Sequence, residues 1–193
     1  EHEIHLIRRS TGHVFVGDYI GGFAPGQLSF VNSNVPHNWV SDLGPGEVVA
    51  GRDLVIQFEP SLLRSASEIF PELRQLFSLA DVFGQSWEFV GEAARTGARL
   101  MSEIHATSGV PRLLKFMELI HLLATTTERV PLTGPGYVPR LDEDAAELIE
   151  EAINIILSSL PGGITLADLS ARMGMSETAF SRFFKRNVGH TFV

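Results

Sequence analysis

The chain has 193 residues, of which 44% are hydrophobic and 20% are charged, a length that suits one medium domain with a smaller one. Its formal net charge of −8 argues against a protein that coats nucleic acid without specificity. The absence of cysteine excludes a disulfide framework and a thiolate metal site, and it fits a cytoplasmic protein. No apolar run reaches the roughly 20 residues of a membrane-spanning helix and no signal peptide is visible, so no membrane partner is expected.

The first 60 residues alternate short apolar segments with glycine and proline turns such as Gly17-Asp18 and Pro25-Gly26. Short strands with no helices between them predict an antiparallel β-barrel or jelly roll, whose interior can hold a small ligand. The predicted strands cover residues 4–7, 13–16, 28–31, 37–40 and 54–58.

Residues 60 to 130 change to helical periodicity. Pro71 and Pro111 stand where first-turn prolines belong. The last helix is apolar around most of its circumference, so one face can pack on the barrel while another needs a partner; the alternative is a larger core within one chain. The predicted helices cover residues 61–70, 71–79, 87–106 and 111–129.

Three prolines and two glycines in residues 130–141 predict an interdomain linker, and a helix capped by Asp142 follows to about residue 160. Thr165 and Asp168 then form a capping-box pattern at the start of a short helix. Gly174 allows a sharp bend, and Ser176 is a favourable N-cap for a second helix. These signals predict two short helices joined by a tight turn.

The second of these helices has two different faces. Phe180, Phe183 and Phe184 recur at helical spacing and are expected to be buried, while a polar and basic stripe follows the other face. This is the helix-turn-helix plan, in which such a stripe reads base edges and contacts phosphates; the alternative is a helical hairpin with a solvated face. The candidate DNA-binding residues are Ser176, Thr178, Ser181, Arg182, Lys185 and Arg186.

Several of these motifs resemble one known family in both halves of the chain. Leu169-Ser170, Met173-Gly174-Met175-Ser176, Phe180-Ser181-Arg182-Phe183-Phe184-Lys185 and Gly189-His190-Thr191 resemble the first helix-turn-helix of AraC/XylS transcription regulators. Gly17-Asp18, Pro25-Gly26 and Asn34-Val35-Pro36-His37-Asn38-Trp39 resemble the cupin half of the same regulators. The resemblance implies an α+β chain with a cupin-like effector-binding and dimerisation domain over 1–130, a linker over 131–141 and a partial DNA-binding domain over 142–193.

The resemblance also implies the partners. They are operator DNA, a small-molecule effector, RNA polymerase and a second copy of the chain, bound through an antiparallel helix pair within residues 87–129. DNA-binding domains of the family carry two helix-turn-helix units, whereas this sequence shows one. We therefore expect a fragment that lacks residues before Glu1 and after Val193 and that binds operator DNA weakly or not at all.

Candidate effector-binding residues lie on or beside the predicted barrel strands. An indole such as Trp39 stacks well on a pyranose face, so a sugar is the favoured effector, with aromatic acids as the alternative. Gln57 is a further wall candidate. The effector-binding set is Glu3, His5, Arg8, His37, Trp39 and Phe58.

Cupins that bind a metal use paired histidines, a glutamate and a later histidine. Glu3 and His37 fall where that glutamate and later histidine would lie, and such donors suit iron, zinc or manganese. The alternative for His37 is a wall histidine hydrogen-bonded to a neighbour. We expect a regulator without enzymatic activity or a cofactor; the other functions considered are a metal-dependent cupin enzyme, of dioxygenase or isomerase type, and a bare dimerisation module.

Overall fold

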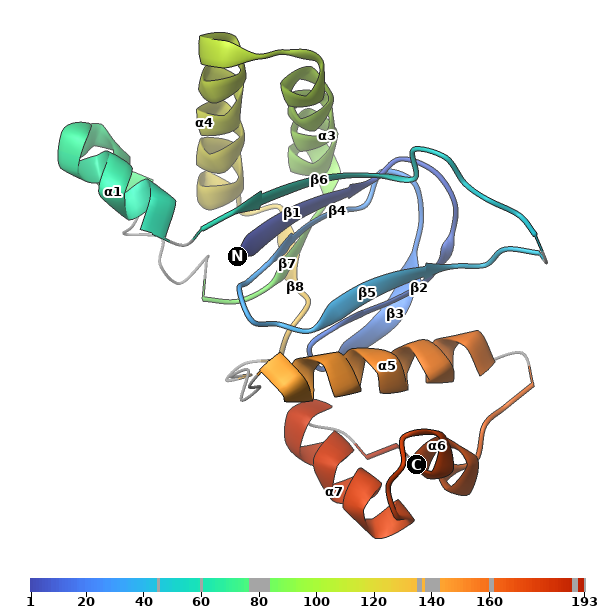
Figure 1. Cartoon of the computed structure of the whole chain (residues 1–193). Helices are drawn as coiled ribbons and strands as arrows, with labels where there is room; N and C mark the ends of the chain where they lie inside the picture. Colours follow the sequence, from blue (N-terminus) through green and yellow to red (C-terminus); the bar gives the residue numbers. More distant parts are fainter. Residues whose placement is uncertain are drawn as a thin grey trace.

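The structure is a computed structural model that describes residues 1–44, 46–59, 61–76, 84–134, 137, 143–159, 162–188 and 191–192. Two antiparallel sheets form its centre (Figure 1), with strand orders β6-β1-β4-β7-β8 and β3-β2-β5. The strands are β1 (His2–Ile7), β2 (Gly12–Val16), β3 (Tyr19–Phe23), β4 (Leu28–Val31), β5 (His37–Ser41), β6 (Asp53–Phe58), β7 (Trp87–Phe89) and β8 (Arg129–Pro131).

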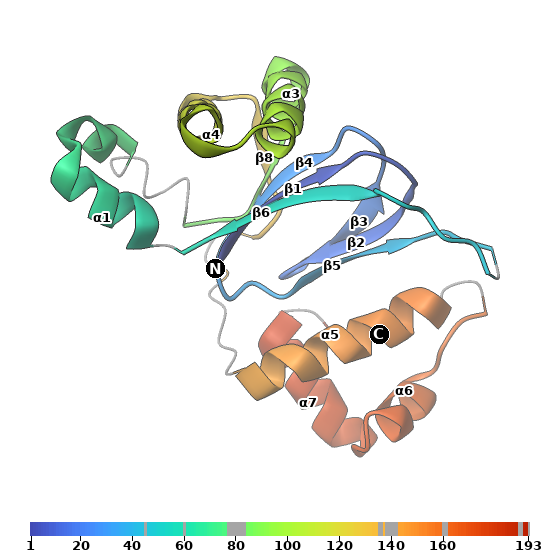
Figure 2. The same cartoon turned by 45° about the horizontal axis from the view of Figure 1, so that its top comes forward.

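Helices cover the outer faces of both sheets (Figure 2). The antiparallel pair α3 (Gly91–Ala106) and α4 (Gly109–Thr125) packs on the five-stranded sheet, next to α1 (Ser61–Ile69) and a 3-10 helix, η1 (Pro71–Leu76). On the opposite side, α5 (Glu143–Ser159) lies against the three-stranded sheet and carries α6 (Leu166–Arg172) and α7 (Glu177–Val188). The predicted α+β class is confirmed. In the part of the chain that the structure describes, no helix has the length and apolar character to cross a bilayer.

The predicted closure of the strands into a barrel is wrong. β1 pairs with β4 and β6, and β2 pairs with β3 and β5, but across the described ranges no strand pairing joins the two sheets. β5 and β6 follow each other in sequence yet are edge strands of different sheets. The fold is therefore a sandwich with an opening between these two edges. Alternating strands look the same in a barrel and a sandwich, so the sequence pattern could not distinguish them.

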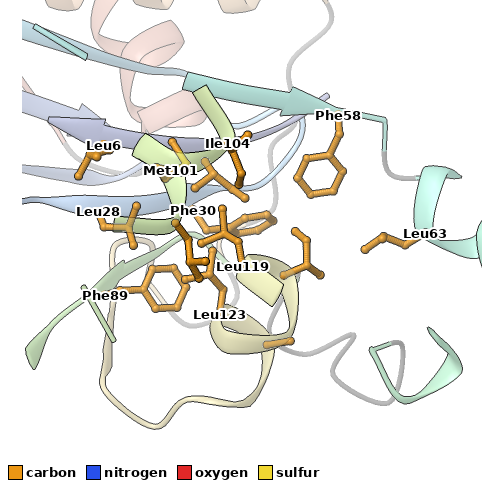
Figure 3. Close-up of a cluster of buried hydrophobic side chains, with 14 residues drawn as sticks. Leu6, Leu28, Phe30, Phe58, Leu63, Phe89, Met101, Ile104, Leu119 and Leu123 are labelled. Atoms are coloured by element: carbon orange, nitrogen blue, oxygen red, sulfur yellow. The ribbon is translucent and has the colours of Figure 1, made fainter. Parts of the chain in front are cut away.

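β1 is buried at every position because both of its faces are covered. Ile4 and Leu6 join the main core with residues of α3 and α4, and Figure 3 labels Leu6 there. Ile7 packs instead in the smaller core between the sheets. Burying a side chain of this size stabilises the fold by about 1.5–3 kcal/mol. The alternation also places Glu3 and His5 between the sheets.

Three strand assignments differ from the sequence prediction. β3 contains Gly21 and Gly22, a turn signal in sequence, yet it pairs with β2 along its length. β8 lies at the end of the predicted fourth helix. Trp87–Phe89, predicted as helix, pairs with β4 and β8, and Gly91 with φ of 61° separates this strand from α3. Pairing with distant strands overrides local periodicity in each case.

The sandwich extends into the first residues of the predicted linker. Leu132 and Thr133 are buried, and the backbone N–H of Gly134 donates to Asp18 Oδ1 at 2.9 Å. Most of the rest of the predicted linker, with Asp142 as the expected helix cap, lies outside the described residues, as do Gly189 and His190 of the motif near the C-terminus.

Candidate functional site

Glu3 is the centre of a polar network between the two sheets. Its Oε1 lies 2.8 Å from His5 Nδ1 and 3.4 Å from His37 Nε2, and its Oε2 accepts a 3.0 Å hydrogen bond from Gln57. Burial raises the pKa of Glu3, but the hydrogen bonds from His37 and His5 outweigh it and hold the pKa well below its usual range. Glu3 is therefore an ionised carboxylate whose oxygens are already partnered.

In His5 and in His37, each of the two ring nitrogens lies near an oxygen acceptor. His37 Nδ1 lies 2.7 Å from the Val35 carbonyl oxygen while its Nε2 faces Glu3. His5 Nε2 lies 3.2 Å from Asp53 Oδ2, within ion-pair distance, but is not aligned for a hydrogen bond with any protein atom. Because buried polar atoms are rarely left unsatisfied, His5 Nε2 is an atom that a ligand oxygen could satisfy.

These side chains line a pocket of about 430 Å³, at the opening between the edge strands β5 and β6. This volume lies in the range of small-molecule sites. The lining residues are Glu3, His5, His37, Asn38, Trp39, Arg52, Val55 and Gln57.

Arg52 lines the pocket and donates hydrogen bonds to both edge strands. Its Nε and Nη2 donate to the two oxygens of Asp53, each at 2.7 Å, and its Nη1 donates to the Trp39 carbonyl oxygen at 2.7 Å. Such a bidentate pair is charge-assisted and fixes the orientation of the guanidinium. Arg52 therefore holds β5 and β6 together instead of offering an unpaired cation to an anionic ligand.

Trp39 lies at the pocket, but one face of its indole is already covered. The residue is only 3% exposed, and its ring stacks on that of His5 with the centroids 3.9 Å apart. Its Nε1 donates to Gln27 Oε1 at 3.1 Å. The stacking argument for a sugar effector therefore fails for this face, because His5 occupies the place of the pyranose.

The structure brings Glu3, His5, His37 and Trp39 of the predicted effector set together at the pocket, and corrects the other two. Arg8 is exposed beyond the end of β1. Phe58 lies on the opposite face of β6, in the core under the helices (Figure 3), where its ring centroid is 5.5 Å from that of Phe116. The physical reason for Phe58 is the period of two along β6, which turns Val55 and Gln57 toward the pocket.

Sequence reasoning missed three lining residues, Asn38, Arg52 and Val55. Alternation from Gln57 could have found Val55, since the two lie two residues apart on one strand. By the same alternation, Asn38 lies on the face of β5 opposite to His37 and Trp39. It reaches the pocket because β5 is an edge strand. Arg52 precedes β6 and carries no sequence signal.

Glu3 and His37 do not by themselves form a metal site. Over the ranges that the structure describes, no group of three or more His, Cys, Asp or Glu side chains is placed to hold a metal ion. The nearest atoms of the pair, His37 Nε2 and Glu3 Oε1, are partners of each other at 3.4 Å. A metal at this pair stays a prediction.

α6 and α7 form the predicted pair of helices with a tight turn. Thr165 Oγ1 accepts from the Asp168 N–H at 3.1 Å, and Ser176 Oγ accepts from the Ala179 N–H at 3.2 Å, so both predicted caps are confirmed. Gly174 has φ of 66°, which confirms the bend. The buried face of α7 is formed by Phe180 and Phe184, with Phe183 half-buried.

The polar stripe of α7 lies on the outside of the molecule. Figure 1 shows α7 on the side of α5 that faces away from the sheets. The predicted DNA-binding residues Ser176, Thr178, Arg182, Lys185 and Arg186 are exposed, and Ser181 is half-buried. A stripe with this exposure is accessible to a partner.

α5 joins these helices to the sandwich. Val14 and Val16 point into the core between the sheets, whereas Phe15 points to the outer face of the three-stranded sheet. There Phe15 is fully buried among residues of α5 and α7. Beside it, Asn38 Nδ2 donates to Asn154 Oδ1 at 2.6 Å. Burying an aromatic ring in this way stabilises the contact by about 1.5–3 kcal/mol. The unit formed by α5, α6 and α7 is therefore docked on the sandwich.

No protein-family model matches the sequence, and no curated protein sequence matches it. Among solved structures, the AraC-like transcriptional activator CuxR is 13% identical with a TM-score of 0.45, over 95% of this chain and 60% of that chain. This chain is similar to an AraC-like activator. It spans less than two thirds of the length of that AraC-like protein.

Two structures of ToxT from Vibrio cholerae are also similar. ToxT from strain O395, bound to (E)-4-(8-methylnaphthalen-1-yl)but-3-enoic acid, is 11% identical with a TM-score of 0.35, over 100% of this chain and 88% of that one. ToxT from strain SCE256, bound to an unsaturated fatty acid, is 8% identical with a TM-score of 0.25, over 99% and 84%. Those ligands are bound by ToxT.

Proposed function

We propose that this chain belongs to a ligand-responsive, DNA-binding transcription regulator of the AraC/XylS type, acts in the cytoplasm and is not an enzyme. The observation that carries the proposal is the two-faced α7, with Phe180 and Phe184 buried and Arg182 and Lys185 exposed. A helix held in this way can enter the major groove with its polar stripe toward the bases. Operator DNA is the proposed partner, with RNA polymerase as a further one.

Arg182→Ala is expected to weaken binding to the preferred sequence about tenfold and to relax the preference at one base pair, because an arginine paired with guanine discriminates by about 1–3 kcal/mol. Lys185→Ala is expected to weaken binding to all sequences alike and to reduce the salt slope by about one. Selection from a random duplex library, followed by fluorescence anisotropy in a low-salt series, measures both effects.

Glu177→Ala is the matched control for these variants, since Glu177 is exposed on the first turn of the same helix and carries the opposite charge. It is not expected to weaken binding. If Arg182→Ala and Lys185→Ala bound DNA as tightly as the original chain, α7 would not be the reading helix and the proposal would fail.

The pocket at the β5–β6 opening is proposed to hold the effector, and its chemistry favours a neutral molecule that carries hydroxyl groups, such as a sugar derivative. Glu3 is ionised, and Arg52 is already paired with Asp53, so an anionic ligand would compete with these carboxylates for their partners. Hydroxyl groups can both donate and accept, which suits His5 Nε2 and the exposed Gln57.

A neutral monosaccharide from a panel is expected to raise the melting temperature of the chain, and Val55→Trp, which fills the pocket, is expected to abolish the shift. At one hundred times its Kd, a ligand stabilises the folded state by about 2.7 kcal/mol, which differential scanning fluorimetry detects. Val48→Trp, on a residue 88% exposed outside the pocket lining, should keep the response. A shift with aromatic acids alone would replace the sugar class, and no shift with either would count against the pocket.

We further propose that a second copy of the chain binds α4. Val110, Leu113 and Leu114, on the first half of this helix, are 67%, 54% and 64% exposed, and partners that cover apolar patches of this kind are typically protein surfaces. This part of α4 belongs to the helix pair for which the resemblance to AraC/XylS regulators implies a role in dimerisation.

Leu113→Asp combined with Leu114→Asp is expected to convert a dimer into a monomer without loss of helical content, because two buried, unpaired charges would oppose the contact. Sedimentation velocity measures the mass, and circular dichroism checks the fold. Leu62→Asp on α1, 46% exposed in the single chain, is the control expected to stay dimeric. A dimer that survives the double substitution would place the interface elsewhere.

A further inference from the structure

β5 carries the pocket on one face and the docking surface for α5 on the other. His37 and Trp39 line the pocket, and Trp39 belongs to the core between the sheets. Val40 instead packs with the residues of α5 and α7 on the outer side. A displacement of β5 at the pocket therefore reaches α5 directly, through one strand.

Asn38 is the residue that takes part in both sites. It lines the effector pocket and also the groove between β5 and α5, where Glu147, Asn154 and Ile155 lie. Its Nδ2 donates to Asn154 Oδ1 at 2.6 Å, and its Oδ1 accepts from the backbone N–H of Trp39 at 2.8 Å. The side-chain amide is one rigid plane, so a group that turns it toward the pocket turns it away from Asn154.

We propose that Asn38 couples occupancy of the pocket to the docking of the α5–α7 unit. An occupant that displaces the Asn38 amide breaks its hydrogen bond to Asn154 and shifts α5 from the docked toward a loosened state. The helices that carry the DNA-binding stripe then change from a fixed to a variable position relative to the sandwich. The consequence for transcription rests on the proposed function, whereas the coupling itself is a property of this chain without DNA.

Hydrogen–deuterium exchange of the α5 backbone amides tests the coupling in the whole chain. Asn38→Ala and Asn154→Ala are each expected to raise α5 exchange about fivefold, the size of effect that one lost hydrogen bond has on a local opening equilibrium. The double variant should show no further increase, because both substitutions remove the same contact. Ser158→Ala is the control on the same groove, since the Ser158 hydroxyl donates to the Ile155 carbonyl oxygen of its own helix.

Val55→Trp serves as an occupant of the pocket that needs no identified ligand. Val55→Trp is expected to raise the exchange rate of the α5 amides as Asn38→Ala does, and to cause no further increase when combined with Asn38→Ala. The exchange rate of the α3 amides should not change, which checks that the sandwich stays folded. Val48→Trp should leave α5 unchanged. Normal α5 protection in both asparagine variants, or a Val55→Trp effect that persists without Asn38, would overturn the coupling. The expected exchange pattern without stabilisation by any sugar would instead support the coupling and refute the proposed effector.

Discussion

Phe180→Ala is expected to unfold the α5–α7 unit and to abolish any DNA binding, while the sandwich stays folded. The Phe180 ring is fully buried and lies with its centroid 5.5 Å from that of Phe184. Truncating a buried phenylalanine to alanine costs about 3–5 kcal/mol, which is much of the stability of a small domain. Denaturant unfolding followed by circular dichroism, with anisotropy on the selected duplex, measures both effects.

The control for this substitution is Phe70→Ala, because Phe70 is 60% exposed and its truncation is expected to change stability by less than about 1 kcal/mol. Both variants remove the same atoms, so a difference between them reports burial. Equal unfolding midpoints for the two variants would mean that the α5–α7 core does not form as described.

Glu3→Gln is expected to destabilise the sandwich by about 3–5 kcal/mol at pH 7, because it removes the charge that His5 and His37 surround in a buried site. The effect has a definite pH dependence. The folded-state pKa of Glu3 lies below its unfolded value, so its stabilisation is complete above about pH 4.5 and is lost as the pH falls toward the folded-state pKa. Urea unfolding at several pH values measures the difference from the original chain.

The gap in stability between Glu3→Gln and the original chain should therefore narrow as the pH is lowered below about 4.5. Glu118→Gln, on the exposed face of α4, serves as the control and should show no gap at any pH. A Glu3→Gln variant as stable as the original at pH 7, or a gap that stays constant down to pH 3, would show that the network does not hold Glu3 ionised.

The C-terminal helices were predictable because their signals are local. Thr165, Gly174 and Ser176 act on backbone groups within three residues of themselves, and the spacing of Phe180 and Phe184 places both on one face of a single helix. No distant part of the chain is needed for these features. The bounds of α6 and α7 accordingly agree with the sequence pattern, as do most of the strands in the first 60 residues.

The pocket was predictable in part. Period-two alternation along β1 and β5 puts Glu3 with His5 and His37 with Trp39 on matching faces, but only the pairing of β1 with β6 brings Gln57 to Glu3. Which face of β6 meets the pocket depends on the register of strand pairing. Phe58 was predicted to line the pocket, but its neighbour Gln57 does so. A shift of one residue exchanges the core and pocket faces of a strand.

By itself the sequence determined the α+β class, the caps and turn of the last two helices, the two faces of α7 and the residues that could form a polar pocket. Only the tertiary structure decided that the sheets stay open between β5 and β6, that Trp87–Phe89 is a strand, and that Phe15 and Asn38 anchor α5. The reason is sequence separation. Caps and periodicity act over a few residues, whereas strand order, the partner of an outward-facing side chain and the Asn38–Asn154 contact depend on segments far apart in the chain.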